Sequence, residues 1–245
     1  MSKMTAKSTL TLTFLTMLFL AVAIPAKAGN VNKSVKVADG AVSSGESSVN
    51  GSISVGRGAE VNGELSTVNG GIRIDADARV KEVSTVNGSL RIDSGVTADD
   101  LSTVNGAIYV AKNVTVDGEI EAVNGEIELD RGSKVARDVS NVNGRIFLQA
   151  STVGGDLSTV SGDIELADAS EVMGDLIVEK SQGWNWGSEK KSRVPEVIIG
   201  PGSRVHGTVR FERDVKLYIS ETAQVGSVSG AMSLSDAVRF SGEHA

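Results

Sequence analysis

The chain has 245 residues, of which 31 are acidic and 24 basic, giving a formal net charge of −7, and it contains no cysteine. Without cysteine it can form neither disulfides nor a thiol-linked lipid anchor, and with only two histidines it cannot assemble a zinc site of ordinary spacing. The acidic balance argues against nucleic acid and anionic membranes as partners.

The first 28 residues have the features of a secretory signal peptide. Lys3 and Lys7 precede an apolar stretch at 10–24, and Ala26-Lys27-Ala28 has the small-x-small pattern of a cleavage site. A transmembrane anchor is the alternative, but threonines interrupt the short apolar stretch and no charged stop-transfer flank follows. We expect an exported bacterial protein, periplasmic, outer-surface or secreted, without a transmembrane anchor after cleavage. The mature chain would begin at Gly29 and carry a formal charge of −10.

A Val-Asn-Gly tripeptide recurs along the rest of the chain at intervals of 18 or 19 residues. Such regular self-similarity is typical of one supersecondary unit that is copied and stacked. Related Ser-Gly pairs end at Gly162 and Gly230. The glycines of the exact repeat are Gly51, Gly70, Gly88, Gly106, Gly125 and Gly144.

Each unit contains an apolar-x-apolar pair, such as Ile72 and Ile74 around Arg73, followed by two further apolar positions. The alternation predicts a half-buried strand with Arg73 facing outward. Asn-Gly is also a hairpin signal, so an antiparallel meander is the alternative. Apolar residues that recur every three to six positions favour three short strands per unit. The predicted fold is therefore all-β: a three-sided parallel β-helix of about ten coils, roughly 48 Å long.

One asparagine and one glycine return at the same corner of each predicted coil. Glycine adopts left-handed backbone conformations at little cost, and we expect it to do so here. Equivalent positions in a parallel stack lie about 4.8 Å apart, which predicts a ladder of side-chain amides with a structural role. The ladder would run through Asn50, Asn69, Asn87, Asn105, Asn124 and Asn143.

We predict a single solenoid domain from residue 29 to 245, interrupted by a loop insertion at about 181–194. Further apolar pairs resume after the insertion and end with Met232 and Leu234. The insertion contains both tryptophans, Trp184 and Trp186, which either fold the loop onto a coil or form a recognition element. Its basic residues Lys190, Lys191 and Arg193 are expected to dock against carboxylates of this chain or of a neighbouring molecule.

Seven consecutive coils carry an acidic residue just before their last apolar position, and these residues should stack in one column. Charges about 4.8 Å apart repel by roughly 0.9 kcal/mol even in water, so something must offset them. Turn amides, Lys81 and Arg137, or bound calcium are the alternatives, and we favour a solvated acidic corner over calcium. The column comprises Glu64, Glu82, Asp100, Glu119, Asp138, Asp156 and Asp175.

The outward residues of the apolar pairs form a second column that includes Tyr109 and Phe147. Aromatic side chains on a flat face can bind an extended polysaccharide, but cross-strand packing explains the same residues, and we favour packing. The complete column is Ser54, Arg73, Arg91, Tyr109, Glu128, Phe147, Glu165, Ile198, Tyr218 and Ser233.

Two stretches, Leu166–Leu176 and Val197–Val209, resemble the repeats of the bactofilins, which are polymer-forming cytoskeletal proteins. The Ser-Thr-Val-Asn-Gly units that start at Ser66, Ser84 and Ser102 are similar to repeats of an exported putative-adhesin family. Together the resemblances cover about residues 35 to 235. They imply a β-helical core that self-associates end to end without nucleotide. The export signal and the interrupted array depart from the bactofilin pattern.

No phosphate-binding loop or nucleophile motif occurs in a suitable context, and His206 has no recognisable acid–base partner, so we expect neither an enzyme nor a bound cofactor other than calcium. The resulting hypothesis is a structural or adhesin-like envelope protein that acts through end-to-end self-association, as a homo-polymer, or through surface contact. The alternative is a β-helix that binds or cleaves a cell-envelope glycan.

Overall fold

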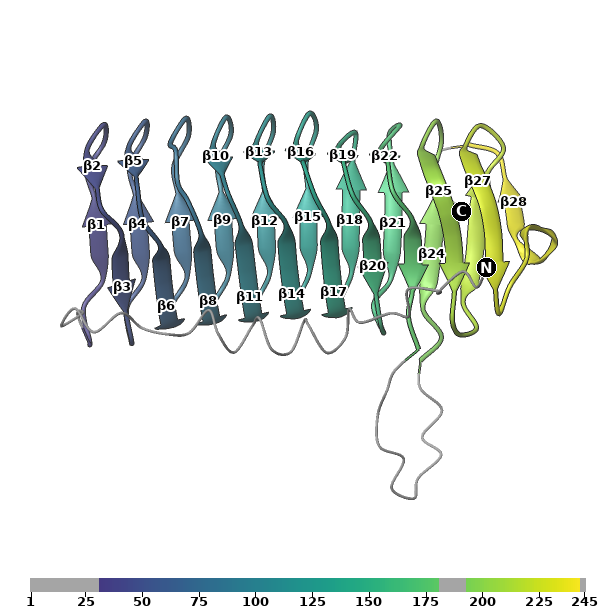
Figure 1. Ribbon diagram of the computed structural model, residues 1–245, viewed down its shortest axis with the longest axis horizontal. Coiled ribbons are helices and arrows are strands. Elements are labelled where there is room, and N and C mark those ends of the chain that lie inside the picture. Colours follow the sequence, from purple (N-terminus) through teal and green to yellow (C-terminus); the bar gives the residue numbers. More distant parts are fainter. Residues whose placement is uncertain (1–30, 181–192, 243–245) are drawn as a thin grey trace, which may run out of the picture.

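A computed structural model describes residues 31–180 and 193–242 of the chain. These residues wind into a straight stack of about ten coils, with the strands of successive coils side by side along its length (Figure 1). Each regular coil contributes one strand to each of three rows. In the coil of Arg79, the second row is reduced to bridges with Glu60 and Thr97.

The first row is an 11-stranded sheet. Its strands in order are β1 (Val35–Val37), β4 (Ile53–Val55), β7 (Ile72–Ile74), β9 (Leu90–Ile92), β12 (Ile108–Val110), β15 (Ile127–Leu129), β18 (Ile146–Gln149), β21 (Ile164–Ala167), β24 (Glu196–Ile199), β26 (Lys216–Ser220) and β28 (Val238–Phe240). The second row comprises β2 (Val42–Ser43), β5 (Glu60–Val61), β10 (Thr97–Ala98), β13 (Thr115–Val116), β16 (Lys134–Val135), β19 (Thr152–Val153) and β22 (Glu171–Val172).

The third row carries the Val-Asn-Gly repeat. It comprises β3 (Glu46–Ser48), β6 (Leu65–Asn69), β8 (Val83–Asn87), β11 (Leu101–Asn105), β14 (Ile120–Asn124), β17 (Val139–Asn143), β20 (Leu157–Thr159) and β23 (Leu176–Val178). The long strand β25 (Arg204–Phe211) pairs with both β22 and β23 and so joins the second and third rows, and β27 (Gln224–Gly230) pairs with β25.

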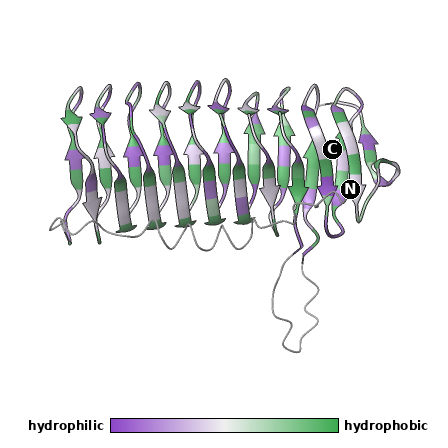
Figure 2. Cartoon of the chain, in the orientation of Figure 1, coloured by the Kyte–Doolittle hydropathy of each residue, from purple (hydrophilic) through white to green (hydrophobic). Residues whose placement is uncertain are grey.

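The strand pairs of the described residues are parallel, so the predicted three-sided parallel β-helix is confirmed and the antiparallel meander is wrong. The register follows the sequence repeat, for example Ile72 beside Leu90 and Arg73 beside Arg91. In Figure 2 the middle of β7 is hydrophilic between hydrophobic ends. Ile72 and Ile74 are buried in one continuous apolar core while Arg73 is exposed, as the alternation predicts.

The repeated glycines are required by the closeness of the stacked backbones. A methyl group on Gly106 would overlap the carbonyl oxygen of Gly88 one coil below, and Gly125 relates to Gly106 in the same way. The expected left-handed conformation is wrong for most of these glycines, because of the six only Gly144 has a positive φ, at 132°. The same carbonyl oxygen accepts a hydrogen bond from the threonine of the motif: the hydroxyl group of Thr103 donates to the oxygen of Gly88 at 3.1 Å.

Left-handed residues lie instead at the turns after most strands of the first row. Gly58 has a φ of 63° and Gly95 one of 74°, while Asp77, Asn113 and Ala150 adopt positive φ at equivalent turns. No atom lies within 4 Å of where a β-carbon on Gly58 would stand. The two kinds of corner therefore use glycine for different reasons, one for space and the other for backbone conformation.

The stack continues in register past the predicted insertion, since Ile164 of β21 pairs with Val197 of β24. The predicted signal peptide, Trp184, Trp186, Lys190 and Lys191 lie outside the described residues. Among the described residues, no helix has the length and apolar character needed to cross a membrane.

The prediction of a last apolar pair at Met232 and Leu234 is wrong. Leu234 begins a short 3₁₀ helix, η1 (Leu234–Asp236), and Val238 of β28 pairs with Tyr218 in the place predicted for Ser233. Terminal repeats are often atypical because they cover the end of a core, and Met232 and Ala237 pack against the end of this one.

The two glycine classes predict different costs for the same substitution. Gly106→Ala should destabilise the fold by about 3 kcal/mol or more, because the methyl group meets backbone that cannot move independently. Gly58→Ala should cost only about 1 kcal/mol, the price of a left-handed alanine. Urea unfolding followed by circular dichroism would measure both, and equal costs would contradict the space requirement at Gly106.

Candidate functional site

The acidic column is present as predicted, with its members stacked on neighbouring coils. The amide of the residue after each acid donates to the carbonyl of the next acid in the column, as Leu101 does to Glu119 at 3.1 Å and Ile120 to Asp138 at 3.0 Å. Each acidic residue of the column directly precedes a strand of the third row. Its aspartates and glutamates behave differently.

Each aspartate of the column accepts a hydrogen bond from the backbone of the coil above. The Oδ1 atom of Asp138 accepts from the amide of Asp156 at 2.8 Å, and Asp156 accepts in turn from Asp175 at 2.7 Å. Asp100 likewise accepts from Glu119 at 2.9 Å, and Asp175 from Thr208 at 2.7 Å. Backbone amides therefore offset the charge of the aspartates, which was one of the predicted alternatives.

The capping carboxylate requires a glycine in the next coil. A methyl group on Gly155 would overlap Oδ1 of Asp138. Every aspartate of the column has a glycine beside it in the next coil. These glycines are Gly118, Gly155, Gly174 and Gly207, beside Asp100, Asp138, Asp156 and Asp175 in that order. The glutamates are followed by larger residues at the same position, namely Lys81 after Glu64, Asp99 after Glu82 and Arg137 after Glu119. Glycine thus accompanies each aspartate and a larger residue each glutamate, although backbone of the coil below also crowds these glycines, as the carbonyl oxygen of Gly174 crowds Gly207.

The glutamates lack these amide bonds, and the pKa of two of them is raised. Burial is the main cause for Glu82, with the charges of Glu64 and Asp100 adding to it. Burial also raises the pKa of Glu119; Arg137 opposes the rise, whereas Asp100 and Asp138 add to it. These carboxylates are therefore the electrostatically costly members of the column.

Glu121 of β14 was not singled out from the sequence. It occupies a position where β11 and β17 have Ser102 and Ser140. Burial raises its pKa to about 7, and the charges of Glu119, Asp100 and Asp138 contribute further. The signal was available in the sequence, because Glu121 replaces the first residue of a Ser-Thr-Val-Asn unit.

The proposed calcium column has no convergent set of ligands among the described residues, where no three acidic or histidine side chains are grouped to hold a metal ion. Of the two expected cations, Arg137 reaches the carboxylate of Asp100 at 3.3 Å. Lys81 pairs with Asp99 at 3.1 Å, beside the column and not within it.

The asparagine ladder is confirmed. Each side-chain amide donates to the side-chain oxygen one coil below, for example Asn105 to Asn87 at 2.9 Å and Asn143 to Asn124 at 3.0 Å. The ladder extends one rung further than predicted, because Asn50 donates to Asn32 at 2.8 Å. These side chains are exposed, so the ladder forms an outer corner of the stack.

On the first-row sheet, arginines pack against both aromatic residues of the predicted binding face. The guanidinium of Arg91 lies 4.7 Å from the ring centre of Tyr109, and that of Arg145 lies 4.4 Å from Phe147. The packing explanation therefore accounts for one face of each ring. Beside Tyr109 lies an open groove of about 310 Å³, which Phe147 does not line. Its polar lining comprises Arg73, Arg91, Asp93, Glu128 and Asp130.

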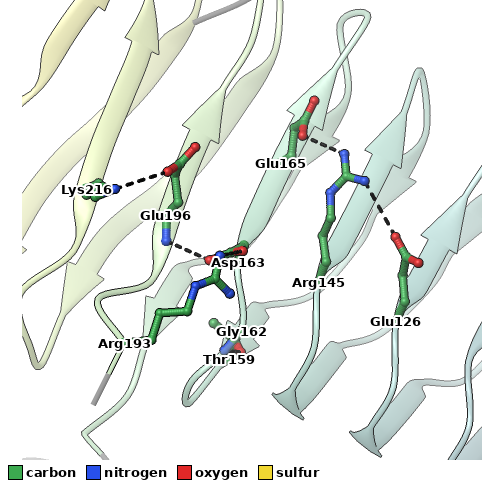
Figure 3. A network of polar contacts seen from close by, with 9 residues as sticks. All are labelled: Glu126, Arg145, Thr159, Gly162, Asp163, Glu165, Arg193, Glu196 and Lys216. Atoms are coloured by element: carbon green, nitrogen blue, oxygen red, sulfur yellow. Dashed lines mark hydrogen bonds and ion pairs between the residues drawn. The ribbon is translucent and has the colours of Figure 1, made fainter. Parts of the chain in front are cut away.

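Polar contacts hold the segment that follows the insertion against the stack (Figure 3). Arg193 reaches Asp163 at 2.6 Å, and the backbone amide of Glu196 donates to the same carboxylate at 2.9 Å. Arg145 lies between Glu165, at 2.6 Å, and Glu126. Arg193 thus docks against a carboxylate of its own chain, one of the two predicted partners.

Comparison of the chain with models of protein families, with curated proteins and with solved structures finds no match. The resemblance to bactofilins and exported adhesins stays a prediction from short motifs.

The pairing of aspartate with glycine predicts a coupled pair of mutations. Gly155→Arg alone should cost about 2 to 3 kcal/mol, since the side chain displaces the carboxylate of Asp138 from its amide. Combined with Asp138→Glu, which reproduces the natural combination of Glu119 and Arg137, it should cost about 1 kcal/mol less than the sum of the single changes. Additive costs in a denaturation cycle would contradict the steric explanation.

The raised pKa of Glu121 predicts that this residue lowers the free energy of unfolding more at high pH than at low pH. Between its ordinary pKa near 4.5 and about 7, the folded chain holds a proton that the unfolded chain releases, so stability falls as pH rises. Glu121→Gln should therefore stabilise the fold by about 1 kcal/mol at pH 8, a value reduced by solvent screening, and much less at pH 5. Glu128→Gln serves as the control, and an equal effect of Glu121→Gln at both pH values would disprove the penalty.

Proposed function

We propose that the protein is an exported, non-enzymatic structural or adhesin-like component of the bacterial cell envelope that acts through self-association or surface contact. The observation that best supports this is the open end of the stack. β1 is the terminal strand of its sheet, and its inward residue Val35 is only half-buried, whereas Ile53, which pairs with it in β4, is fully buried. Unpaired strand edges with apolar neighbours are sites at which another chain can add.

The backbone of β1 shows which of its groups have no partner in the described part of the chain. Val35 donates to Ser52, and Val37 accepts from Gly56, both at 2.9 Å. The amide and carbonyl of Lys36, between them, therefore face away from β4 toward the open end. The charge of Lys36 moderates pairing at this edge, so we expect association to be reversible and dependent on concentration.

The opposite end offers a complementary edge. There β28 is the terminal strand of the same sheet. If β1 of one copy pairs with β28 of the next, the sheet continues from molecule to molecule. Such a heterologous contact produces a linear polymer.

Replacing Lys36 by proline tests this contact with little effect on the fold, because the lost amide has no hydrogen-bond partner among residues 31–180 and 193–242. Electron microscopy of the mature protein should show rods longer than the roughly 50 Å of one molecule. Lys36→Pro should leave rods of one molecule's length, whereas Lys36→Thr, which keeps the amide, should still form longer ones. Single rods of the unaltered protein at high concentration would refute assembly through the ends.

Glycan binding is the second candidate, supported by the groove beside Tyr109. An aromatic ring with arginine and carboxylate groups around it offers the donors and acceptors that sugar hydroxyl groups require. On a glycan array, Tyr109→Ala should lose binding while Phe147→Ala, outside the groove, retains it. Loss only with Trp184→Ala or Trp186→Ala would move the site to the insertion.

A further inference from the structure

One flank of the stack carries almost no charge. The outward side chains of β6, β8, β11, β14 and β17 form two rows that we call the serine–valine face. Among these residues Glu121 is the single charged side chain, although 22% of the whole chain is charged. The serine row contains Ser66, Ser84, Ser102 and Ser140, with Glu121 between the last two, and the valine row contains Val68, Val86, Val104, Val123 and Val142.

The inward neighbours hold this face flat. Leu101 and Thr103 of β11 are fully buried, and Thr103 is tied to the coil below. The serines stack in register from coil to coil, for example Ser84 beside Ser102. Ser84 and Ser140 are buried and Ser66 and Ser102 are half-buried, whereas the valines are all half-buried, so a low row of small hydroxyl groups runs beside a higher row of branched side chains. A copy of this face turned by half a revolution would bring its higher row over the low row of the first.

The margins of the face determine how that copy must lie. The acidic column runs along the serine side, and the asparagine ladder runs along the valine side. A two-fold axis parallel to the stack places each acidic column over the asparagine ladder of the other copy. An axis across the stack would place the two acidic columns together, which like-charge repulsion disfavours.

We propose that the serine–valine face is a self-association surface on which a second copy of the chain packs with its long axis parallel, the valine row of each copy over the serine row of the other. This proposal rests on the proposed function, because both require self-association. The two contacts differ: the ends would join copies into a line, whereas the serine–valine face would join two copies side by side into a closed pair.

The area of the face is enough for a weak contact only. From β6 to β17 it is roughly 24 Å long and about 16 Å wide, from strand spacing and a five-residue strand. Two such faces bury about 800 Å² in total, which is the size of weak, transient interfaces. The expected association is therefore reversible and occurs at micromolar concentrations or above.

Glu121 makes this contact sensitive to pH. In the parallel arrangement its carboxyl lies against the valine row of the second copy, where a charge would lose its water. The charged groups around it on its own and adjacent coils are Glu119, Asp100, Asp138 and Arg137. Since burial already raises the pKa of Glu121 to about 7, the uncharged form is accessible at mild pH and favours association.

The test uses the mature chain with Lys36→Pro, so that the ends are blocked. Sedimentation velocity over a concentration series should show a monomer–dimer equilibrium that is tighter at pH 6 than at pH 8. Val104→Lys on the face should weaken the dimer by about tenfold or more. Thr115→Lys, an equally outward position on β13, should not weaken it, and Glu121→Ser should remove the pH dependence.

A dimer that Val104→Lys leaves unchanged, or a monomer at both pH values, would overturn the side-by-side contact. Neither result would decide the proposed function, which electron microscopy of the chain with its natural Lys36 tests separately. Circular dichroism of Val104→Lys excludes unfolding as the cause of a lost dimer.

Discussion

The structure depends on one constraint: equivalent residues of successive coils lie directly above one another at the spacing of hydrogen-bonded strands, about 4.8 Å. Every position must therefore tolerate its own kind as a neighbour. Asparagine does, because its amide can donate to one neighbour and accept from the other. Glycine at the repeated corner also does, because any side chain there would enter the backbone of the coil below.

Carboxylates are the hardest case for such a stack, and the chain resolves it in two ways. The aspartates are short enough to bind the amide of the coil above, at the cost of a glycine there. The glutamates make no such bond and have a larger residue at that position in the next coil, and burial raises the pKa of Glu82 and Glu119. A further charged side chain (Lys81, Asp99 or Arg137) therefore stands beside the column only where the acid of the coil below is a glutamate. Beside it lies a flank almost free of charge, which is the proposed contact surface.

Much of this arrangement was predictable from the sequence because the repeat interval alone determines which residues stack. The asparagine ladder and the acidic column are direct consequences of that interval. Turn amides were one of the predicted partners of this column, but their restriction to the aspartates was not predictable, since it depends on a difference of one methylene group. The reason for the repeated glycine was mistaken because Asn-Gly more often marks a left-handed turn. Met232 and Leu234 were misplaced because the last coil covers the core and departs from the repeat.

Small-angle X-ray scattering of the mature protein over a concentration series tests the central claim most directly, because it separates the length of a rod from its cross-section. The account predicts a rod about 50 Å long at low concentration. With Lys36→Pro in place, rising concentration should enlarge the cross-section at constant length. A particle that is not rod-shaped at low concentration would contradict the stacked fold, and a cross-section that never changes would contradict contact through the serine–valine face.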